Sequence, residues 1–291
     1  MIHRTVFHND RLLPIEESRL SPGQAGLLNG WGLFTTLRIV EGEAFCYERH
    51  WKRLQKDAAL THLPIPFDAG RVREQLAQLI AANRATEACA RIYLIYNSIG
   101  HWRSDEGFPT VDLILYTADL PNYREPVRLA VREHGRHAGS PLAGVKTTAW
   151  LNNVWNFYEA QQAGFDEVIL LNERGEVAEC TAANVFCVRQ GEVYTPPLSS
   201  GCLEGVTRGL LLEIGPKQGI PVREGILSPA DVYSADEVFI SSTNRNLLAV
   251  GEVNGHKLPA APGAITRRLD VAFAAFQAEY IAARKQAVAS R

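Results

Sequence analysis

Strand-like and helical segments alternate irregularly along this chain. The hydrophobic runs 34–40 and 44–47 flank Glu41-Gly42-Glu43, which is typical of a β-hairpin, and helical spacing of apolar residues follows over 48–62 and 72–83. Two more strand-like runs, 91–96 and 111–117, come next. A parallel doubly wound sheet requires a regular strand–helix–strand order, which is missing here. The predicted fold class is therefore mixed α+β.

The second half continues in the same mixed manner. A helix is predicted over 150–163, ending at Gly164, because glycine commonly follows the last helical turn. Short strand-like runs separated by polar turns then predict a β-meander, and they are 167–171, 177–178, 184–188 and 192–195. A helix over 206–214, a strand over 237–242 and an alanine-rich surface helix over 270–291 complete the prediction.

Length and punctuation predict two domains. At roughly 150 residues per domain, 291 residues suggest two. The stretch 119–126 carries two prolines between periodic segments, which favours a boundary there. We expect a small N-terminal α/β domain over 1–119, a linker over 120–126 and a larger C-terminal α+β domain over 127–291.

Charge and cysteine usage exclude several classes of protein. The 30 Lys and Arg nearly balance the 32 Asp and Glu, so neither nucleic acid nor an anionic membrane is an expected partner. The N-terminus lacks the apolar core of a signal peptide, and the five cysteines form no C-x-x-C pair, so a cytoplasmic location is expected. Histidines and cysteines show no metal-ligand spacing, and no dinucleotide or Walker motif is present.

Lys146 is the first candidate for chemistry. It is one of only six lysines and the only charged residue between positions 138 and 158. Apolar surroundings lower the pKa of a lysine, so that its neutral amine can attack a carbonyl group. The alternative is a lysine whose stem packs on apolar surface while its ammonium group reaches solvent.

Two further segments could bind an anion and a heteroaromatic ring. Gly205 opens the helix predicted at 206, so the N–H groups of Val206 and Thr207 would point at an anion, and the polar segment 242–244 could complete a phosphate site. Glu179, between two strand-like runs, could hold a protonated ring nitrogen. Taken singly, these features are equally an ordinary helix start, a turn and a solvated glutamate.

Taken in order, these features resemble a known family. They are similar to the class IV pyridoxal-phosphate enzymes, which include branched-chain and D-amino-acid aminotransferases and 4-amino-4-deoxychorismate lyase. The resemblance runs from about residue 5 to about residue 275 and implies the two-domain fold type IV. The segments that carry it are Leu28–Phe34, Glu48–Leu54, Lys146, Glu179–Asn184, Leu203–Arg208 and Ser242–Asn244.

The resemblance implies roles for these residues. Lys146 would form a Schiff base with pyridoxal 5'-phosphate, Glu179 would accept the N–H of the pyridinium ring, and Leu203 would pack on one ring face. Trp150 lies where many members have a tyrosine that contacts the cofactor. The implied phosphate ligands are Arg53, the backbone amides of Val206 and Thr207, Thr243 and Asn244. The resemblance also implies a homodimer.

The resemblance fixes the cofactor better than the reaction. We expect an aminotransferase that moves an amino group between a branched-chain or similar amino acid and a 2-oxo acid. Phe34, Thr36 and Arg103 are the expected substrate contacts, Arg103 as a carboxylate ligand. Thr35 and Thr36 follow the aromatic residue where transaminases commonly have glutamate, which favours the alternative of a lyase that releases pyruvate and 4-aminobenzoate. A non-catalytic binding protein on the same scaffold is a third hypothesis.

Overall fold

The computed structural model describes residues 1–21, 23–97 and 109–289. For residues 288 and 289 it describes the backbone only. The chain divides into two compact units, each treated separately below. Unit 1 comprises Met1–Pro121, Lys146–Trp150 and Ala278–Arg291, and unit 2 comprises Asn122–Val145 and Leu151–Gln277. Unit 1 thus takes two segments from the part of the chain that follows the predicted linker.

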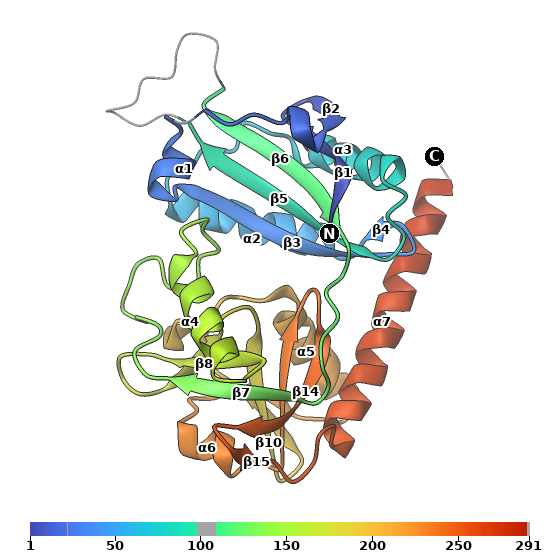
Figure 1. Ribbon diagram of the computed structural model, residues 1–291. Coiled ribbons are helices and arrows are strands. Elements are labelled where there is room, and N and C mark those ends of the chain that lie inside the picture. Colours follow the sequence, from blue (N-terminus) through green and yellow to red (C-terminus); the bar gives the residue numbers. More distant parts are fainter. Residues whose placement is uncertain (22, 98–108, 290–291) are drawn as a thin grey trace. The chain divides into compact units, whose positions relative to one another are not determined.

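Unit 1 is built on a six-stranded antiparallel sheet with strand order β2-β1-β6-β5-β3-β4 (Figure 1). Its strands are β1 Ile2–His8, β2 Arg11–Pro14, β3 Gly32–Val40, β4 Glu43–Ala44, β5 Ala88–Tyr96 and β6 Val111–Ala118. Its helices are η1 Ile15–Glu17, α1 Ala25–Asn29, α2 Tyr47–Leu60 and α3 Ala69–Ala82. The predicted hairpin is confirmed by the pairing of β3 with β4, but Tyr47 begins α2 rather than ending a strand.

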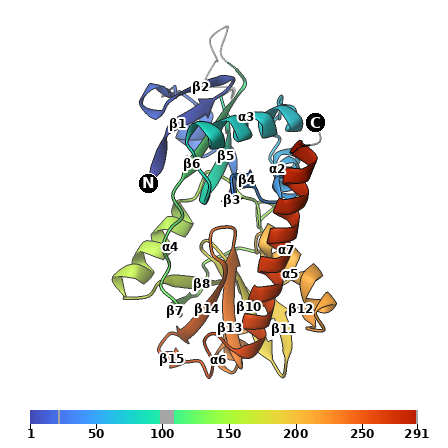
Figure 2. The same ribbon diagram turned by 90° about the vertical axis from the view of Figure 1, so that its right-hand side faces the viewer.

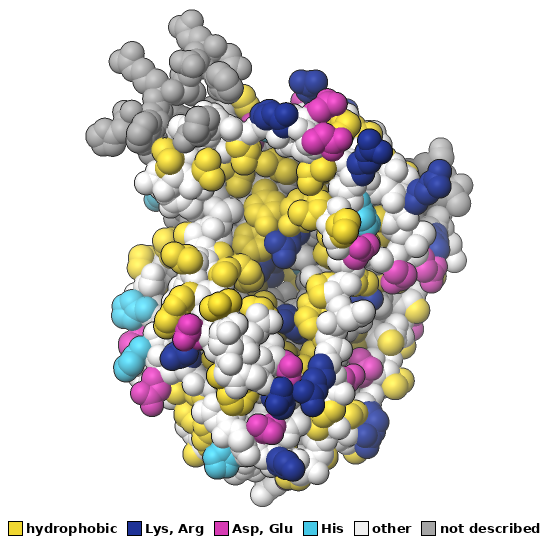
Figure 3. All heavy atoms as spheres, viewed as in Figure 1, with side chains coloured by type: hydrophobic (Ala, Val, Ile, Leu, Met, Phe, Trp, Pro, Cys, Tyr) yellow, Lys and Arg dark blue, Asp and Glu magenta, His cyan; other side chains and the backbone are white. Residues whose placement is uncertain are grey.

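The two faces of this sheet differ in character. Helices α2 and α3 cover one face, where alternate residues such as Leu37, Ile92 and Leu113 are buried with Leu54 and Leu76 of the helices (Figures 1 and 2). The opposite face is turned toward the viewer in Figure 1, and Figure 3 shows hydrophobic side chains gathered there. Alternation along a strand therefore separates a core face from a face available for function.

Unit 2 contains a nine-stranded mixed sheet with strand order β12-β11-β10-β13-β14-β7-β8-β9, and β15 pairs with β14. Its strands are β7 Val127–Arg132, β8 Glu167–Leu171, β9 Val177–Cys180, β10 Asn184–Arg189, β11 Glu192–Thr195, β12 Val222–Glu224, β13 Glu237–Ser242, β14 Asn246–Val253 and β15 His256–Lys257. Its helices are α4 Leu151–Gln162, η2 Leu198–Ser200, α5 Val206–Lys217 and α6 Pro229–Tyr233, and α7 Ala264–Ala289 begins here and ends in unit 1.

The mixed α+β fold class is confirmed, but the predicted meander is wrong at one step. β8 pairs with β9 and β10 pairs with β11, as expected for neighbours in sequence. β10, however, takes β13 as its other partner, and β7 and β14 lie between β13 and β8 in the sheet. In this order residues of all six strands, β7 to β10, β13 and β14, contribute to one hydrophobic cluster. No helix among the described residues combines the length and apolarity needed to cross a bilayer.

Candidate active-site residues

Lys146 lies in unit 1, beside the strand that carries Phe34. The Phe34 N–H donates to the Lys146 carbonyl over 3.1 Å, and the Lys146 N–H donates to Asp57 Oδ2 of α2 over 3.3 Å. The side-chain Nζ lies 4.5 Å from the ring centroid of Phe34 and 5.7 Å from that of Trp150. Burial raises the pKa of Asp57, while the Lys146 N–H and Arg53 act in the opposite direction. The backbone of Lys146 is therefore fixed by two hydrogen bonds, and its amine faces two aromatic rings.

Helix α2 also positions Arg53, the predicted phosphate ligand. Arg53 Nη2 donates to Thr35 Oγ1 over 2.9 Å, and Thr35 Oγ1 lies 2.9 Å from His50 Nδ1. All three side chains are buried. Burial, together with the charges of Arg53 and Lys146, lowers the pKa of His50 well below its usual range. The neutral imidazole thus fixes Thr35, and Thr35 fixes the guanidinium group.

A second arginine on unit 1 escaped the sequence analysis. Arg91 lies directly opposite Thr36 on the neighbouring strand, just as Tyr93 lies opposite Phe34, so the four side chains share the sheet face opposite the helices. Arg91 Nη1 donates to the Tyr93 hydroxyl over 3.0 Å, and its guanidinium lies 5.6 Å from the Phe34 ring centroid. Among the described residues no carboxylate lies within ion-pair distance of Arg91. Arg91 is the only charged residue in the strand-like run 91–96, and this isolated charge is the sequence feature that could have identified it.

In unit 2, Glu179 is held at both carboxylate oxygens. Arg136 Nε and Nη2 lie 3.0 and 2.8 Å from Oε1, and the Leu203 N–H donates to Oε2 over 3.0 Å. Arg136 Nη1 also donates to Asn153 Oδ1 over 3.0 Å. Glu179 is 6% exposed, so these bonds are made in a largely dry environment. Sequence reasoning missed Arg136, because it lies 43 positions from Glu179 in no recognisable motif.

Leu203 leads directly into an uncapped helix N-terminus. Gly205 is the N-cap of α5 and provides no side chain to accept from the first-turn N–H groups, which include those of Val206 and Thr207. A Cβ atom at Gly205 would lie 2.1 Å from Asn184 Oδ1, so only glycine fits. Asn184 Nδ2 donates to the Leu203 carbonyl over 3.0 Å, which fixes the approach to the helix.

The predicted turn with Thr243 and Asn244 joins β13 to β14. Ser242 pairs with Asn246, which has a φ of 52°, the left-handed conformation that often closes a three-residue hairpin turn. The preceding residue, Ser241, lies opposite Asn184 on β10, so the β13 end of this turn lies beside the strand that supports Gly205. Ser241 Oγ is buried and has no hydrogen-bond partner among the described residues.

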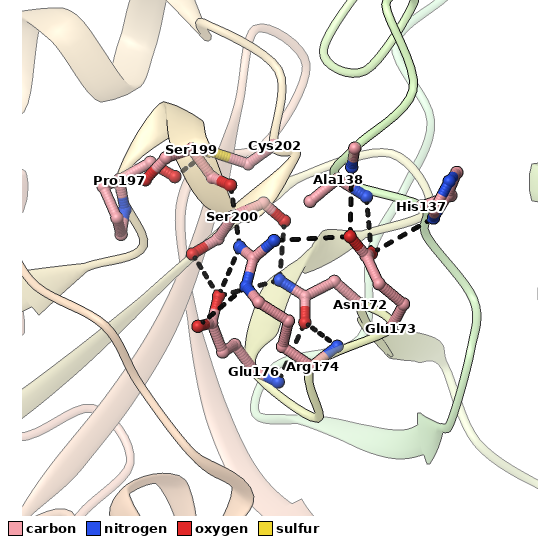
Figure 4. A network of polar contacts seen from close by, with 11 residues as sticks. His137, Ala138, Asn172, Glu173, Arg174, Glu176, Pro197, Ser199, Ser200 and Cys202 are labelled. Carbon is pink, nitrogen blue, oxygen red and sulfur yellow. Dashed lines mark hydrogen bonds and ion pairs between the residues drawn. The ribbon is translucent and has the colours of Figure 1, made fainter.

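A polar network connects the segments 137–139, 172–176 and 197–200 of unit 2 (Figure 4). Glu173 accepts from the N–H groups of Ala138 and Gly139 over 2.7 and 3.0 Å, and Arg174 Nη2 donates to the Ser199 carbonyl over 2.8 Å. Hydrogen bonds from its own and the Ala138 N–H groups lower the pKa of Glu173 to about 2. The network therefore fixes the segments that precede Val145 and Cys202.

On unit 1, Phe34 and Thr36 share the sheet face opposite the helices and Lys146 lies beside Phe34, whereas Arg53 bonds to Thr35 from helix α2. Unit 2 contains Glu179, Leu203, Val206, Thr207, Thr243 and Asn244. Arg103 lies outside the described residues. Among the described residues, no three His, Cys, Asp or Glu side chains are grouped to hold a metal ion.

Comparison with known proteins identifies the family. The model of the class IV aminotransferases matches residues 32–253. The chain is 28% identical over 275 residues to a putative branched-chain-amino-acid aminotransferase of Methanocaldococcus jannaschii, covering 92% of this chain and 94% of that protein. It is 30% identical over 258 residues to a D-alanine aminotransferase of Listeria monocytogenes, covering 86% and 88%.

The fold agrees with a solved member. The branched-chain amino acid aminotransferase from Escherichia coli superposes with a TM-score of 0.87 at 24% identity, covering 94% of each chain. This likeness confirms the predicted class IV fold. Together with the family match over residues 32–253, it leads to one conclusion: the chain belongs to the class IV aminotransferases and is a transaminase.

Proposed function

We propose that this transaminase uses pyridoxal 5'-phosphate to move an amino group between a branched-chain or similar amino acid and a 2-oxo acid. The observation that carries the proposal is the segment 203–205 of unit 2. Its first N–H is bonded to the buried Glu179, and two residues later it opens the uncapped N-terminus of α5. A ring whose nitrogen faces an acid, and which carries a phosphate group, needs these two features a short distance apart.

The residues of this chain fit the cofactor. Glu179 keeps its position through Arg136 and Leu203 and offers a carboxylate to a ring N–H. The first turn of α5 offers N–H groups and the positive end of the helix dipole to a phosphate dianion. Gly205 provides no capping side chain to compete for these N–H groups, and Ser241 Oγ is a buried hydroxyl group in need of a partner.

Each residue then has one task. Pyridoxal phosphate, when bound, supplies an aldehyde that condenses with amines and a ring that stabilises negative charge at the substrate Cα. Lys146 Nζ provides the resident amine. With a substrate amino acid bound, Nζ would carry the proton from the substrate Cα to C4′ of the cofactor, and it would carry it back to Cα in the reverse half-reaction. The rings of Phe34 and Trp150 lie 4.5 and 5.7 Å from Nζ and border the space that this amine occupies.

Phosphate binding falls to Arg53 of unit 1 and to the α5 amides, Thr243 and Asn244 of unit 2. The hydrogen bond from Arg53 Nη2 to Thr35 fixes the orientation of the planar guanidinium group before a ligand binds. A firm phosphate anchor fixes the ring, and a fixed ring lets one Cα bond of the substrate align with its π system.

We assign the substrate carboxylate to Arg91. Its guanidinium lies among the rings of Phe34, Tyr93 and Tyr116 on the sheet face opposite the helices. Its one hydrogen bond among the described residues is to a neutral hydroxyl group. A planar guanidinium fork matches a carboxylate, and the aromatic surroundings suit an apolar side chain. Phe34 and Thr36 would contact that side chain, and Arg103 stays a predicted second carboxylate ligand.

The oligomeric state and location are also proposals. Helix α4 exposes an apolar stripe at helical spacing, formed by Leu151, Val154, Trp155 and Tyr158, with exposed fractions of 78, 49, 52 and 56%. Such a stripe is unusual on a monomer, which supports a homodimer in which a second copy covers it. All five cysteines are free thiols, which agrees with a cytoplasmic location.

A lyase acting on 4-amino-4-deoxychorismate is the second candidate. The sequence Phe34-Thr35-Thr36 favours it, because transaminases commonly have a glutamate after the aromatic residue. Thr35 instead places a neutral hydroxyl group against Arg53.

The test uses purified holoenzyme. Borohydride reduction followed by peptide mapping should find a pyridoxyl group on Lys146 and on no other lysine. A single amino acid, screened among L and D forms, should then convert the cofactor spectrum from the pyridoxal to the pyridoxamine form without an acceptor. Release of pyruvate from aminodeoxychorismate without a 2-oxo acid would instead favour the lyase. Absence of the Lys146 adduct would overturn both.

A further inference from the structure

We propose that the buried ion pair between Arg245 and Glu167 is a positioning pair, which holds the turn of Thr243 and Asn244 so that it can bind the phosphate of the cofactor. The inference rests on the proposed function, since it assigns these residues an indirect role at the same site. Neither residue contacts the cofactor in this proposal.

Arg245 is the last residue of the turn, and its guanidinium contacts three residues that lie outside the turn. Its Nη2 donates to Glu167 Oε2 over 3.0 Å, and its Nη1 donates to the Ala182 carbonyl over 2.9 Å. The guanidinium also lies 4.5 Å from the ring centroid of Tyr123. The side chains of Arg245 and Glu167 are 8% and 1% exposed. A planar donor with two bonded nitrogens fixes both the distance and the orientation of the turn.

Glu167 is itself held from several sides. Its Oε1 accepts from the Val168 N–H over 3.0 Å and from the Thr181 hydroxyl. Because a buried carboxylate is costly without donors, this full set of partners makes Glu167 a fixed point on β8.

The same pair connects the turn to the neighbourhood of Glu179. The Thr181 hydroxyl bonds to Glu167, the Thr181 carbonyl accepts from Asn153 Nδ2, and Asn153 Oδ1 accepts from Arg136, which binds Glu179. One continuous set of hydrogen bonds therefore runs from the acid that would face the ring nitrogen to the turn that would bind the phosphate. All of these residues lie in unit 2. Fixing both ends in one network keeps the two ligand groups at a constant separation.

The experiment compares two ligands that differ only in the phosphate, pyridoxal phosphate and pyridoxal. Dissociation constants are measured by equilibrium dialysis on the full-length protein and on Arg245→Met, Arg245→Lys and Glu167→Gln. Arg245→Met should weaken binding of pyridoxal phosphate by about tenfold, the loss expected from one misplaced charge-assisted contact, while binding of pyridoxal changes less than about twofold. Arg245→Lys and Glu167→Gln should give smaller losses with the same selectivity.

A matched control is Arg189→Met, which removes an arginine that pairs with Asp231 in the same unit but away from this network. It should leave the ratio of the two dissociation constants unchanged. Equal losses for both ligands in the Arg245 and Glu167 variants would mean a merely structural role and would overturn the inference, as would no loss at all. If Arg245→Met fails to fold, the selectivity of Arg245→Lys and Glu167→Gln decides the question.

A further variant separates this inference from the proposed function. Thr243→Val should lose affinity for pyridoxal phosphate and not for pyridoxal. If Thr243→Val binds both ligands normally, the phosphate assignment itself is wrong. If Thr243→Val shows the selective loss and the Arg245 variants do not, only the positioning role of Arg245 and Glu167 is wrong.

Discussion

Replacing Thr35 by valine removes one hydroxyl group at almost constant volume. That hydroxyl accepts from Arg53 Nη2 and bonds to His50 Nδ1, both over 2.9 Å, in a buried part of unit 1. A hydrogen bond contributes about 1 kcal/mol net, and a buried partner left without one costs about 1–3 kcal/mol. The variant should therefore unfold with a free energy about 2–4 kcal/mol lower than that of the wild type.

The same change should release Arg53 from its fixed orientation. If Arg53 binds the cofactor phosphate, the loss of a pre-oriented charge-assisted contact should weaken pyridoxal phosphate binding by about 10- to 100-fold. Urea unfolding of the apoprotein gives the first quantity, and equilibrium dialysis of the cofactor gives the second.

Thr117→Val is a closely matched control. Thr117 is also buried on the unit 1 sheet. Its hydroxyl lies 2.8 Å from His3 Nδ1 and accepts from the side-chain amide of Asn83 over 2.8 Å. It should lose comparable stability and no cofactor affinity. Equal affinity losses in the two variants would refute the reasoning, because they would trace the effect to general destabilisation rather than to Arg53.

Three further outcomes are expected. Since the buried His50 has a lowered pKa, a proton binds to this residue only in the unfolded state as the pH falls below 6.5. The free energy of unfolding should therefore decrease by about 1 kcal/mol between pH 6.5 and 5.5, and by less in His50→Gln; an equal decrease in the wild type and the variant would contradict this. Gly205→Ala places a Cβ 2.1 Å from Asn184 Oδ1, so it should displace the start of α5 and weaken cofactor binding at least about tenfold. Gly209→Ala in the same helix, where a Cβ would meet no atom within 4 Å, should leave cofactor binding unchanged. Arg136→Met leaves a buried Glu179 without its counter-ion and should cost about 3 kcal/mol in urea unfolding; a loss below about 1 kcal/mol would mean that water replaces the arginine.

The sequence by itself determined the local elements and the chemical types of the candidate residues. Helix α2 and strand β13 follow from the spacing of apolar residues, which is a property of neighbours along the chain. The isolation of Lys146 among apolar residues and the glycine at the start of α5 are also local features. The order of these motifs was enough to predict the class IV family, which the comparisons confirm.

Only the tertiary structure decided which of these residues are held, and by what. Arg91 is placed opposite Thr36 by the register of β5 on β3, and Glu179 meets Arg136 across 43 positions. Glu167 and Arg245 are 78 positions apart. Such pairs depend on strand register and on the packing of a shared core, which are set by the whole sheet at once and leave no periodic signal in the chain. The sheet order that separates β9 from β10 is likewise a property of the whole sheet, in which β13, β14, β7 and β8 lie between two strands that are adjacent in sequence.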